Sequence, residues 1–230
     1  MENLADFETS TVRERAASLT RGAVTAREKL ERLFPFVRDD IAFGFPPGGD
    51  LVAASETLRL GYGQCNTKAT LLLALCKTCG IPARIHFSLI RKDIQKGFFT
   101  GLAYRLLPEE LSHSWIEVEL EGRWRRIDTF INDLPLFHAA KRALRSRGWQ
   151  TGYSLALGDG EASADLNLDH EAFQQMDAVT RDNGTWDDPA DYYASPHYRN
   201  RPGLLRLMAY RLMIGRINKR VRALRLTAPA

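Results

Sequence analysis

One cysteine, Cys65, stands where proteins place reactive thiols. It follows the Gly61-Tyr-Gly63 break and opens a run of apolar residues that predicts a buried helix. The unpaired N–H groups and the dipole of a helix N-terminus favour negative charge, so a thiol placed there has a lowered pKa. The alternative is that Cys65 is a small buried hydrophobic residue, as most free cysteines are.

The other two cysteines, Cys76 and Cys79, lie near the end of the same predicted helix. Their Cys-x-x-Cys spacing occurs in zinc and redox sites, but a redox pair has its first cysteine at a helix start. No second Cys/His pair at zinc spacing completes a metal site. We therefore assign both cysteines to the core and expect no metal and no cofactor.

Two predicted strands supply partners for the thiol. A two-residue turn at Glu121-Gly122 would pair the strands so that His113, Trp115, Asp128 and Phe130 share one face. Asp128 would then lie diagonal to His113, within reach of a hydrogen bond. A carboxylate that orients an imidazole, which in turn activates a thiol, is the arrangement of nucleophilic catalysis. A bulged turn would change this register, and a lone histidine on a strand is often structural.

Five short motifs occur in order along this part of the chain. They are Gly63-Gln-Cys65-Asn-Thr-Lys-Ala69, Leu71-Leu-Leu-Ala-Leu75, Gly80-Ile-Pro-Ala-Arg84, His113-Ser-Trp115 and Gly122-Arg-Trp124-Arg-Arg-Ile-Asp128. Together they resemble the transglutaminase-like superfamily, over about residues 50–135. The resemblance implies an α+β, papain-like core in which a central cysteine-bearing helix packs against an antiparallel sheet, with added N- and C-terminal helices.

The resemblance also implies roles for individual residues. Cys65 would be the nucleophile, His113 the general base and acid, and Asp128 the residue that orients His113. Gln64 could supply an oxyanion donor, although a polar residue beside the cysteine can equally stabilise the turn. Trp115 could wall the substrate cleft or pack the sheet.

The elements that position these residues follow from the hydrophobic pattern. Thr25 and Glu28 have the spacing of a capping box, and Pro35 should interrupt the helix that it starts. The pattern predicts helices up to about residue 22 and over 25–37, 55–60, 65–79, 136–147 and 204–226, and strands over 83–91, 113–120 and 123–130. Residues 148–198 give weak signals and are interpreted as ordered loops.

Length and composition are those of a globular protein. The chain has 230 residues, of which 44% are hydrophobic and 26% charged, which disfavours disorder, a collagen-like fibre and a disulfide scaffold. We predict one compact unit in three parts: an N-terminal helical segment (1–50), the catalytic core (51–135) and a C-terminal extension (136–230). Three unpaired cysteines and the lack of an apolar leader indicate a reducing, cytoplasmic setting. The sequence contains no run of about 18 apolar residues, so we expect no membrane-spanning helix.

The positive charge is concentrated at the C-terminus. The net charge of the chain is +4, but residues 199–230 carry nine basic and no acidic side chains, so the remainder carries −5. The helix over 204–226 could bind an anionic membrane surface, or it could pack on the acidic body. Base-reading and aromatic-stacking motifs are absent, so we expect no nucleic-acid partner.

The function predicted from these features is a thiol enzyme acting on amide bonds, as protease, amidase or acyltransferase, with a peptide or protein substrate. One alternative is a catalytically silent scaffold of the same fold. The other is a protein whose basic C-terminal helix serves membrane-surface binding.

Overall fold

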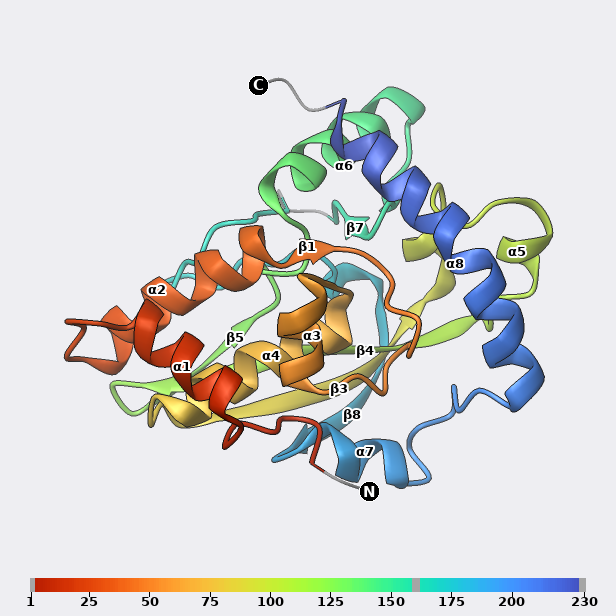
Figure 1. Cartoon of the computed structure of the whole chain (residues 1–230). Coiled ribbons are helices and arrows are strands. Elements are labelled where there is room, and N and C mark those ends of the chain that lie inside the picture. Colours follow the sequence, from red (N-terminus) through yellow and green to blue (C-terminus); the bar gives the residue numbers. More distant parts are fainter. Residues whose placement is uncertain (1–2, 159–161, 228–230) are drawn as a thin grey trace.

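The computed structural model describes residues 3–158 and 162–227, and its centre is a long helix packed on an antiparallel sheet (Figure 1). The sheet has the strand order β5-β4-β3-β8, and each neighbouring pair is antiparallel. Its strands are β3 (Ala83–Arg91), β4 (Glu110–Leu120), β5 (Arg123–Ile127) and β8 (Val179–Trp186). The α+β fold expected from the sequence is therefore confirmed.

The β4–β5 hairpin has the predicted turn and register. Leu120 pairs with Arg123, and the ladder continues to Ile116 and Ile127. Glu121 and Gly122 have φ values of 53° and 73°, the left-handed pair that a type I′ turn requires. Because the ladder ends at Ile127, Asp128 lies just beyond it, where β4 has an open edge.

The central helix is α4 (Cys65–Thr78), which begins at the predicted residue. Every side chain from Cys65 to Cys76 is buried, because the sheet covers one side and α1 (Ser10–Leu19), α2 (Ala26–Pro35) and α3 (Ala54–Leu60) cover the other (Figure 1). The predicted capping box at Thr25 starts α2, and a π-helical turn, η1 (Phe36–Asp40), follows Pro35.

The remaining helices and strands complete the fold around this core. They are β1 (Ala42–Phe43), β2 (Tyr62–Gly63), η2 (Lys92–Gln95), α5 (Gly101–Arg105), α6 (Leu134–Arg147), β6 (Thr151–Gly152), β7 (Leu155–Ala156), η3 (Met176–Ala178), α7 (Pro189–Ala194) and α8 (Leu204–Arg225). β1 and β2 pair in parallel and hold the segment before α4 against the segment after η1.

Residues 148–198 differ from the prediction, because they contain β8. This strand forms the edge of the sheet beside β3, with register shifts along the pair. Its central residues, Arg181 to Gly184, are polar and turn-forming, so its sequence lacks the alternation of a half-buried strand. Long-range pairing with β3 stabilises β8 in spite of its composition.

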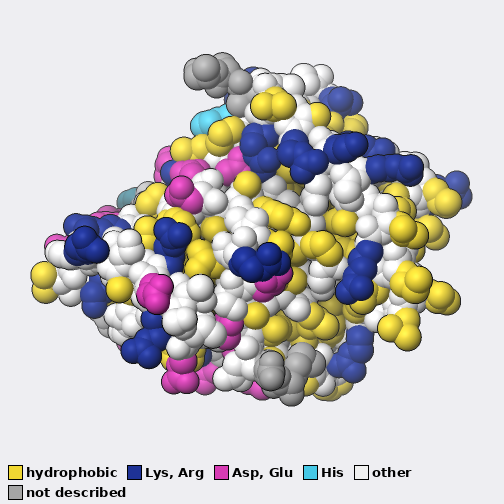
Figure 2. Space-filling view, in the orientation of Figure 1, with side chains coloured by type: hydrophobic (Ala, Val, Ile, Leu, Met, Phe, Trp, Pro, Cys, Tyr) yellow, Lys and Arg dark blue, Asp and Glu magenta, His cyan; other side chains and the backbone are white. Residues whose placement is uncertain are grey.

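The C-terminal helix α8 packs on the body through its second half. Ile214, Ile217 and Val221 are buried, and Arg225 forms an ion pair with Asp133 at 2.7 Å. The first half is open to solvent, with Leu204 and Leu212 exposed by 83% and 82%. Figure 2 shows hydrophobic and basic side chains gathered along α8. Among the described helices, none combines the length and apolar character needed to cross a membrane.

Candidate active site

The thiol of Cys65 lies at the start of α4 against the open edge of β4. The thiol donates to Asn66 Oδ1 over 3.7 Å, and the same oxygen accepts from the hydroxyl of Ser114 at 3.0 Å. Ser114 directly follows His113 on β4. The structure thus brings Cys65 to the strand backbone that carries His113, although these residues lie 48 positions apart.

The protonation of Cys65 differs from the expectation for an exposed helix start. Its residue is only 9% exposed, and burial, followed by the negative charge of Asp50, raises the pKa of the thiol to about 12. The backbone N–H groups of Asn66 and Ser114 lower the pKa of the thiol, but their effect is smaller than that of burial. The expectation of an ionised thiol is therefore wrong for this closed arrangement, because loss of water around the thiolate outweighs the helix terminus.

The imidazole of His113 is fully buried on β4. Neither of its ring nitrogens hydrogen-bonds to another residue within the described ranges. Burial lowers the pKa of His113 to about 3, so the ring is neutral at physiological pH. A neutral imidazole can accept a proton, which is the state a general base requires.

The carboxylate of Asp128 is also fully buried, and it binds backbone. Its two oxygens accept hydrogen bonds from the N–H groups of Gln174 and Gln175, at 2.7 and 2.8 Å. Burial raises the pKa of Asp128 to about 7 in spite of these bonds. In the described part of the chain no hydrogen bond joins Asp128 to His113, so the bond expected from the strand register is not formed in this structure.

Sequence reasoning missed the residue that ties these elements together, Asn66. Its side-chain Nδ2 donates to Asp50 Oδ1 at 3.0 Å and to the Ser112 carbonyl at 3.2 Å. Its Oδ1 accepts from the Ser114 hydroxyl at 3.0 Å. An asparagine in the first turn of a buried helix was the available signal, since a buried amide must find partners.

Comparison with known proteins gives the family. A family model described as the Transglutaminase-like superfamily matches residues 13–129, a little more than half of the chain. The chain belongs to the transglutaminase-like superfamily. The resemblance inferred from the five sequence motifs is confirmed, and with it the papain-like type of core. Membership supports a thiol-dependent enzyme.

Solved structures similar to this transglutaminase-like chain are distant. One is a candidate cysteine protease from Cytophaga hutchinsonii, with 14% identity and a TM-score of 0.49, covering 83% of this chain and 46% of its own. Another is a candidate protease from Parabacteroides distasonis, with 17% identity and a TM-score of 0.38, covering 54% of this chain and 25% of its own. The chain therefore spans less than half the length of either protein. Curated proteins give no match.

Two further predicted site residues of this transglutaminase-like core have defined surroundings. Gln64 directs its side-chain Nε2 to Asp50 Oδ1 at 2.6 Å, so it fixes the loop before α3 to the start of α4. Trp115 is buried and stacks on His86, with ring centroids 4.2 Å apart, while its centroid lies 6.0 Å from that of His113.

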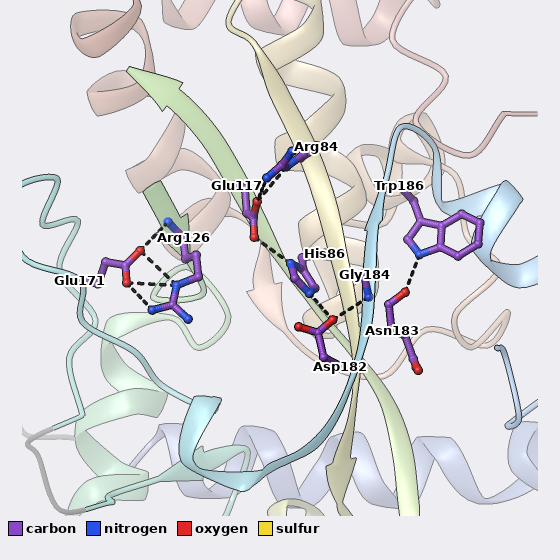
Figure 3. Close-up of polar contacts among 9 residues, drawn as sticks. All are labelled: Arg84, His86, Glu117, Arg126, Glu171, Asp182, Asn183, Gly184 and Trp186. Atoms are coloured by element: carbon purple, nitrogen blue, oxygen red, sulfur yellow. Dashed lines mark hydrogen bonds and ion pairs between the residues drawn. The ribbon is translucent and has the colours of Figure 1, made fainter. Parts of the chain in front are cut away.

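A polar chain crosses the sheet face that carries Trp115 (Figure 3). His86 lies between Glu117 and Asp182, with both nitrogen–oxygen distances at 2.7 Å, and Arg84 binds the other oxygen of Glu117. Burial raises the pKa of Glu117, but the hydrogen bonds from His86 and Arg84 outweigh burial and lower this pKa to about 2. Arg84 thus pairs with a carboxylate, and His86 links its own strand, β3, to β4 and β8.

The remaining cysteines stay outside the site. Cys76 is buried in the core, as predicted, whereas Cys79 is partly exposed and lies 3.8 Å from the hydroxyl of Thr20. Cys79 thus packs at the margin of the core, because it follows the last residue of α4, Thr78, and lies against the end of α1. Across the described ranges, no group of three or more His, Cys, Asp and Glu side chains is arranged to hold a metal ion.

Proposed function

We propose that the protein catalyses thiol-dependent acyl transfer or hydrolysis at an amide bond of a peptide or protein. Cys65 is the nucleophile, His113 the general base and acid, and Asp128 the positioning residue for His113. The observation that carries this proposal is the bridge through Asn66, whose Oδ1 accepts from the Cys65 thiol at 3.7 Å and from the hydroxyl of Ser114, one residue after His113, at 3.0 Å. It joins a helix-start thiol to the histidine strand, as nucleophilic catalysis requires.

The reaction starts from a neutral pair, because burial holds Cys65 as a thiol and His113 as an imidazole. As the sulfur attacks the amide carbon, the thiol proton passes to His113, and a carbon–sulfur bond forms. The imidazolium then protonates the leaving amine while the carbon–nitrogen bond breaks, which leaves a thioester. Water or a second amine then attacks the thioester carbon, its proton passes through His113 to the sulfur, and the carbon–sulfur bond breaks, which restores the Cys65 thiol and releases the acid or the new amide.

The negative charge that develops on the carbonyl oxygen needs hydrogen-bond donors. The backbone N–H groups of Ser114 and Asn66, which lower the pKa of Cys65, are candidates, together with the backbone N–H of Cys65 and the side chain of Gln64. Asp128 contributes through His113, because an ionised carboxylate favours the imidazolium that forms during the reaction.

Turnover of peptide amides, with and without an added primary amine, tests this proposal. We expect Cys65→Ser to abolish turnover, and His113→Gln to reduce kcat by about 10²–10⁴-fold, the usual contribution of a general base. Cys79→Ser is the matched control, since that thiol lies at the other end of α4 and should leave kcat unchanged. Turnover that survives in Cys65→Ser would contradict the proposal. A folded chain that turns over no amide would support the silent scaffold.

A second candidate function rests on the exposed first half of α8. Leu204, Leu205, Met208 and Leu212 are all more than 60% exposed and fall on one side of the helix. The exposed basic residues Arg216, Lys219 and Arg222 continue that solvent-facing side, and this composition is typical of a helix that binds an anionic membrane surface. Sedimentation with anionic vesicles should be strong at low salt and weaken as salt rises. Leu212→Glu should abolish it, and unchanged sedimentation would contradict this function.

A further inference from the structure

The loop residue Asp50 sits over the start of the catalytic helix. Its Oδ1 accepts hydrogen bonds from Gln64 Nε2 at 2.6 Å and from Asn66 Nδ2 at 3.0 Å. These two residues flank Cys65 in the sequence. Its Oδ2 accepts from the hydroxyl of Tyr198 at 3.2 Å. The carboxylate is therefore held in place by groups on both sides of the nucleophile.

Asp50 lacks a counter-charge although it is held so closely. Its three hydrogen-bond donors are neutral, and no Lys or Arg within the described ranges forms an ion pair with it. Its residue is only partly exposed, and burial raises the pKa of its carboxyl. A partly buried carboxylate without a cation is costly unless something supplies the positive charge.

Aromatic side chains line the same region. Tyr198 packs on Tyr193 with ring centroids 4.8 Å apart, and Tyr192 lies 5.8 Å from Tyr198. The hydroxyl of Tyr193 is buried and has no hydrogen-bond partner among the described residues. These rings are almost fully buried and pack on one another, so they surround Asp50 with apolar surface and supply no counter-charge.

We propose that Asp50 selects substrates that carry a positively charged side chain next to the amide bond attacked by Cys65. This inference rests on the proposed function and names the substrate class, a basic peptide. An ammonium or guanidinium group would supply the missing positive charge beside the carboxylate, while the neutral donors keep their bonds. An acidic peptide would be repelled at the same position.

Such a cation would also act on the nucleophile. The charge of Asp50 is second only to burial in raising the pKa of the Cys65 thiol. A substrate cation that neutralises this charge would lower the thiol pKa, and it would do so only when the correct substrate is bound. Selection and activation would then depend on one contact.

Binding of matched peptides to a Cys65→Ala variant tests the inference without requiring turnover. The probes are pentapeptide amides of alanine with one lysine at each position in turn, and the same peptides with norleucine, which keeps the aliphatic stem without the charge. We expect at least one lysine peptide to bind about tenfold more tightly than its norleucine partner. Adding Asp50→Asn should remove this difference, and Asp187→Asn, at an exposed aspartate elsewhere, should preserve it.

The outcomes separate this inference from the proposed function. Charge-selective binding that depends on Asp50, in a chain whose Cys65 form turns over no amide, would uphold the inference and reject the proposed function. Equal binding of lysine and norleucine peptides, or no binding of any lysine peptide at millimolar concentration, would overturn the inference. If Asp50→Asn fails to fold, the comparison of the two peptide series on the chain with Asp50 intact still decides it.

Discussion

The hydroxyl of Ser114 donates to Asn66 Oδ1 over 3.0 Å, and this bond fastens the thiol-bearing helix to the histidine-bearing strand. Asn66 is fully buried and uses both ends of its amide. Asn66→Ala would leave the Ser112 carbonyl and the Ser114 hydroxyl without their partner, so we expect a loss of about 1–3 kcal/mol in the free energy of unfolding. Urea titration measures it. Asn3→Ala, at an exposed residue, should change it by less than about 0.5 kcal/mol.

Alkylation of Cys65 should depend steeply on pH. Because burial raises its pKa to about 12, the thiolate fraction in the closed protein should rise about tenfold per pH unit from pH 7 to 10. Iodoacetamide labelling followed by peptide mapping measures the rate at each cysteine. A plateau in the Cys65 rate below pH 8 would show that the thiol is already ionised and would contradict this prediction. Cys76, buried deeper in the core, should react more slowly still.

Asp128 should make folding less favourable as pH rises. Its folded pKa, raised to about 7 by burial, exceeds the value of about 4 in an unfolded chain. The group therefore stabilises the fold fully below pH 4 and loses that contribution as pH rises through 7. Asp128→Asn removes this titration, so its stability relative to the wild type should increase between pH 4 and 8. Thermal unfolding across this range measures it, and a constant difference would contradict it.

His86 should contribute a pH dependence over a higher range. Burial lowers the pKa of His86, but the hydrogen bonds to Glu117 and Asp182 outweigh burial and raise this pKa above its ordinary value of 6.5. A raised folded pKa gives stability that is present below pH 6.5 and is lost as pH rises through the folded value. His86→Phe keeps the stacking on Trp115 but removes the charge, so it should destabilise the protein more at pH 6 than at pH 9. An equal loss at both values would show that His86 acts only by packing.

The stability of the protein should depend on Arg225, near the C-terminal end of α8. This side chain binds Asp133, which is nearly fully buried, and also the Phe43 carbonyl at 2.8 Å. Arg225→Ala would leave a buried carboxylate unpaired, with an expected cost of about 3–5 kcal/mol. Arg222→Ala, one turn earlier at an exposed position, is the matched control and should cost less than about 0.5 kcal/mol. Chemical denaturation of both variants compares them.

Local sequence rules predict the elements whose cause is local. The capping box at Thr25, the turn at Glu121-Gly122 and the apolar helix that starts at Cys65 each depend on a few neighbouring residues. β8 depends on pairing with β3, about 90 residues earlier, and on the bond from Asp182 to His86. Its polar central residues give no local sign of a strand, so no window of sequence could reveal it.

The candidate site divides in the same way. Cys65, His113 and Asp128 could be named from motifs and register, because each belongs to a regular element or its end. Asp50 could not, since it reaches Cys65 from a loop through Gln64 and Asn66. The protonation states could not be predicted either, because they depend on how completely the fold excludes water from the site.

The backbone N–H groups of Gln174 and Gln175 donate to Asp128, and the hydroxyl of Tyr198 donates to Asp50. These three donor residues lie beyond residue 129, where the family match ends. The candidate site therefore includes hydrogen-bond donors from outside the segment that the family model matches. A truncation to the matched segment would leave two site carboxylates open to water and change their acidity. Divergence of the C-terminal segment offers evolution a means to retune this chemistry while the helix and strands that present the thiol stay the same.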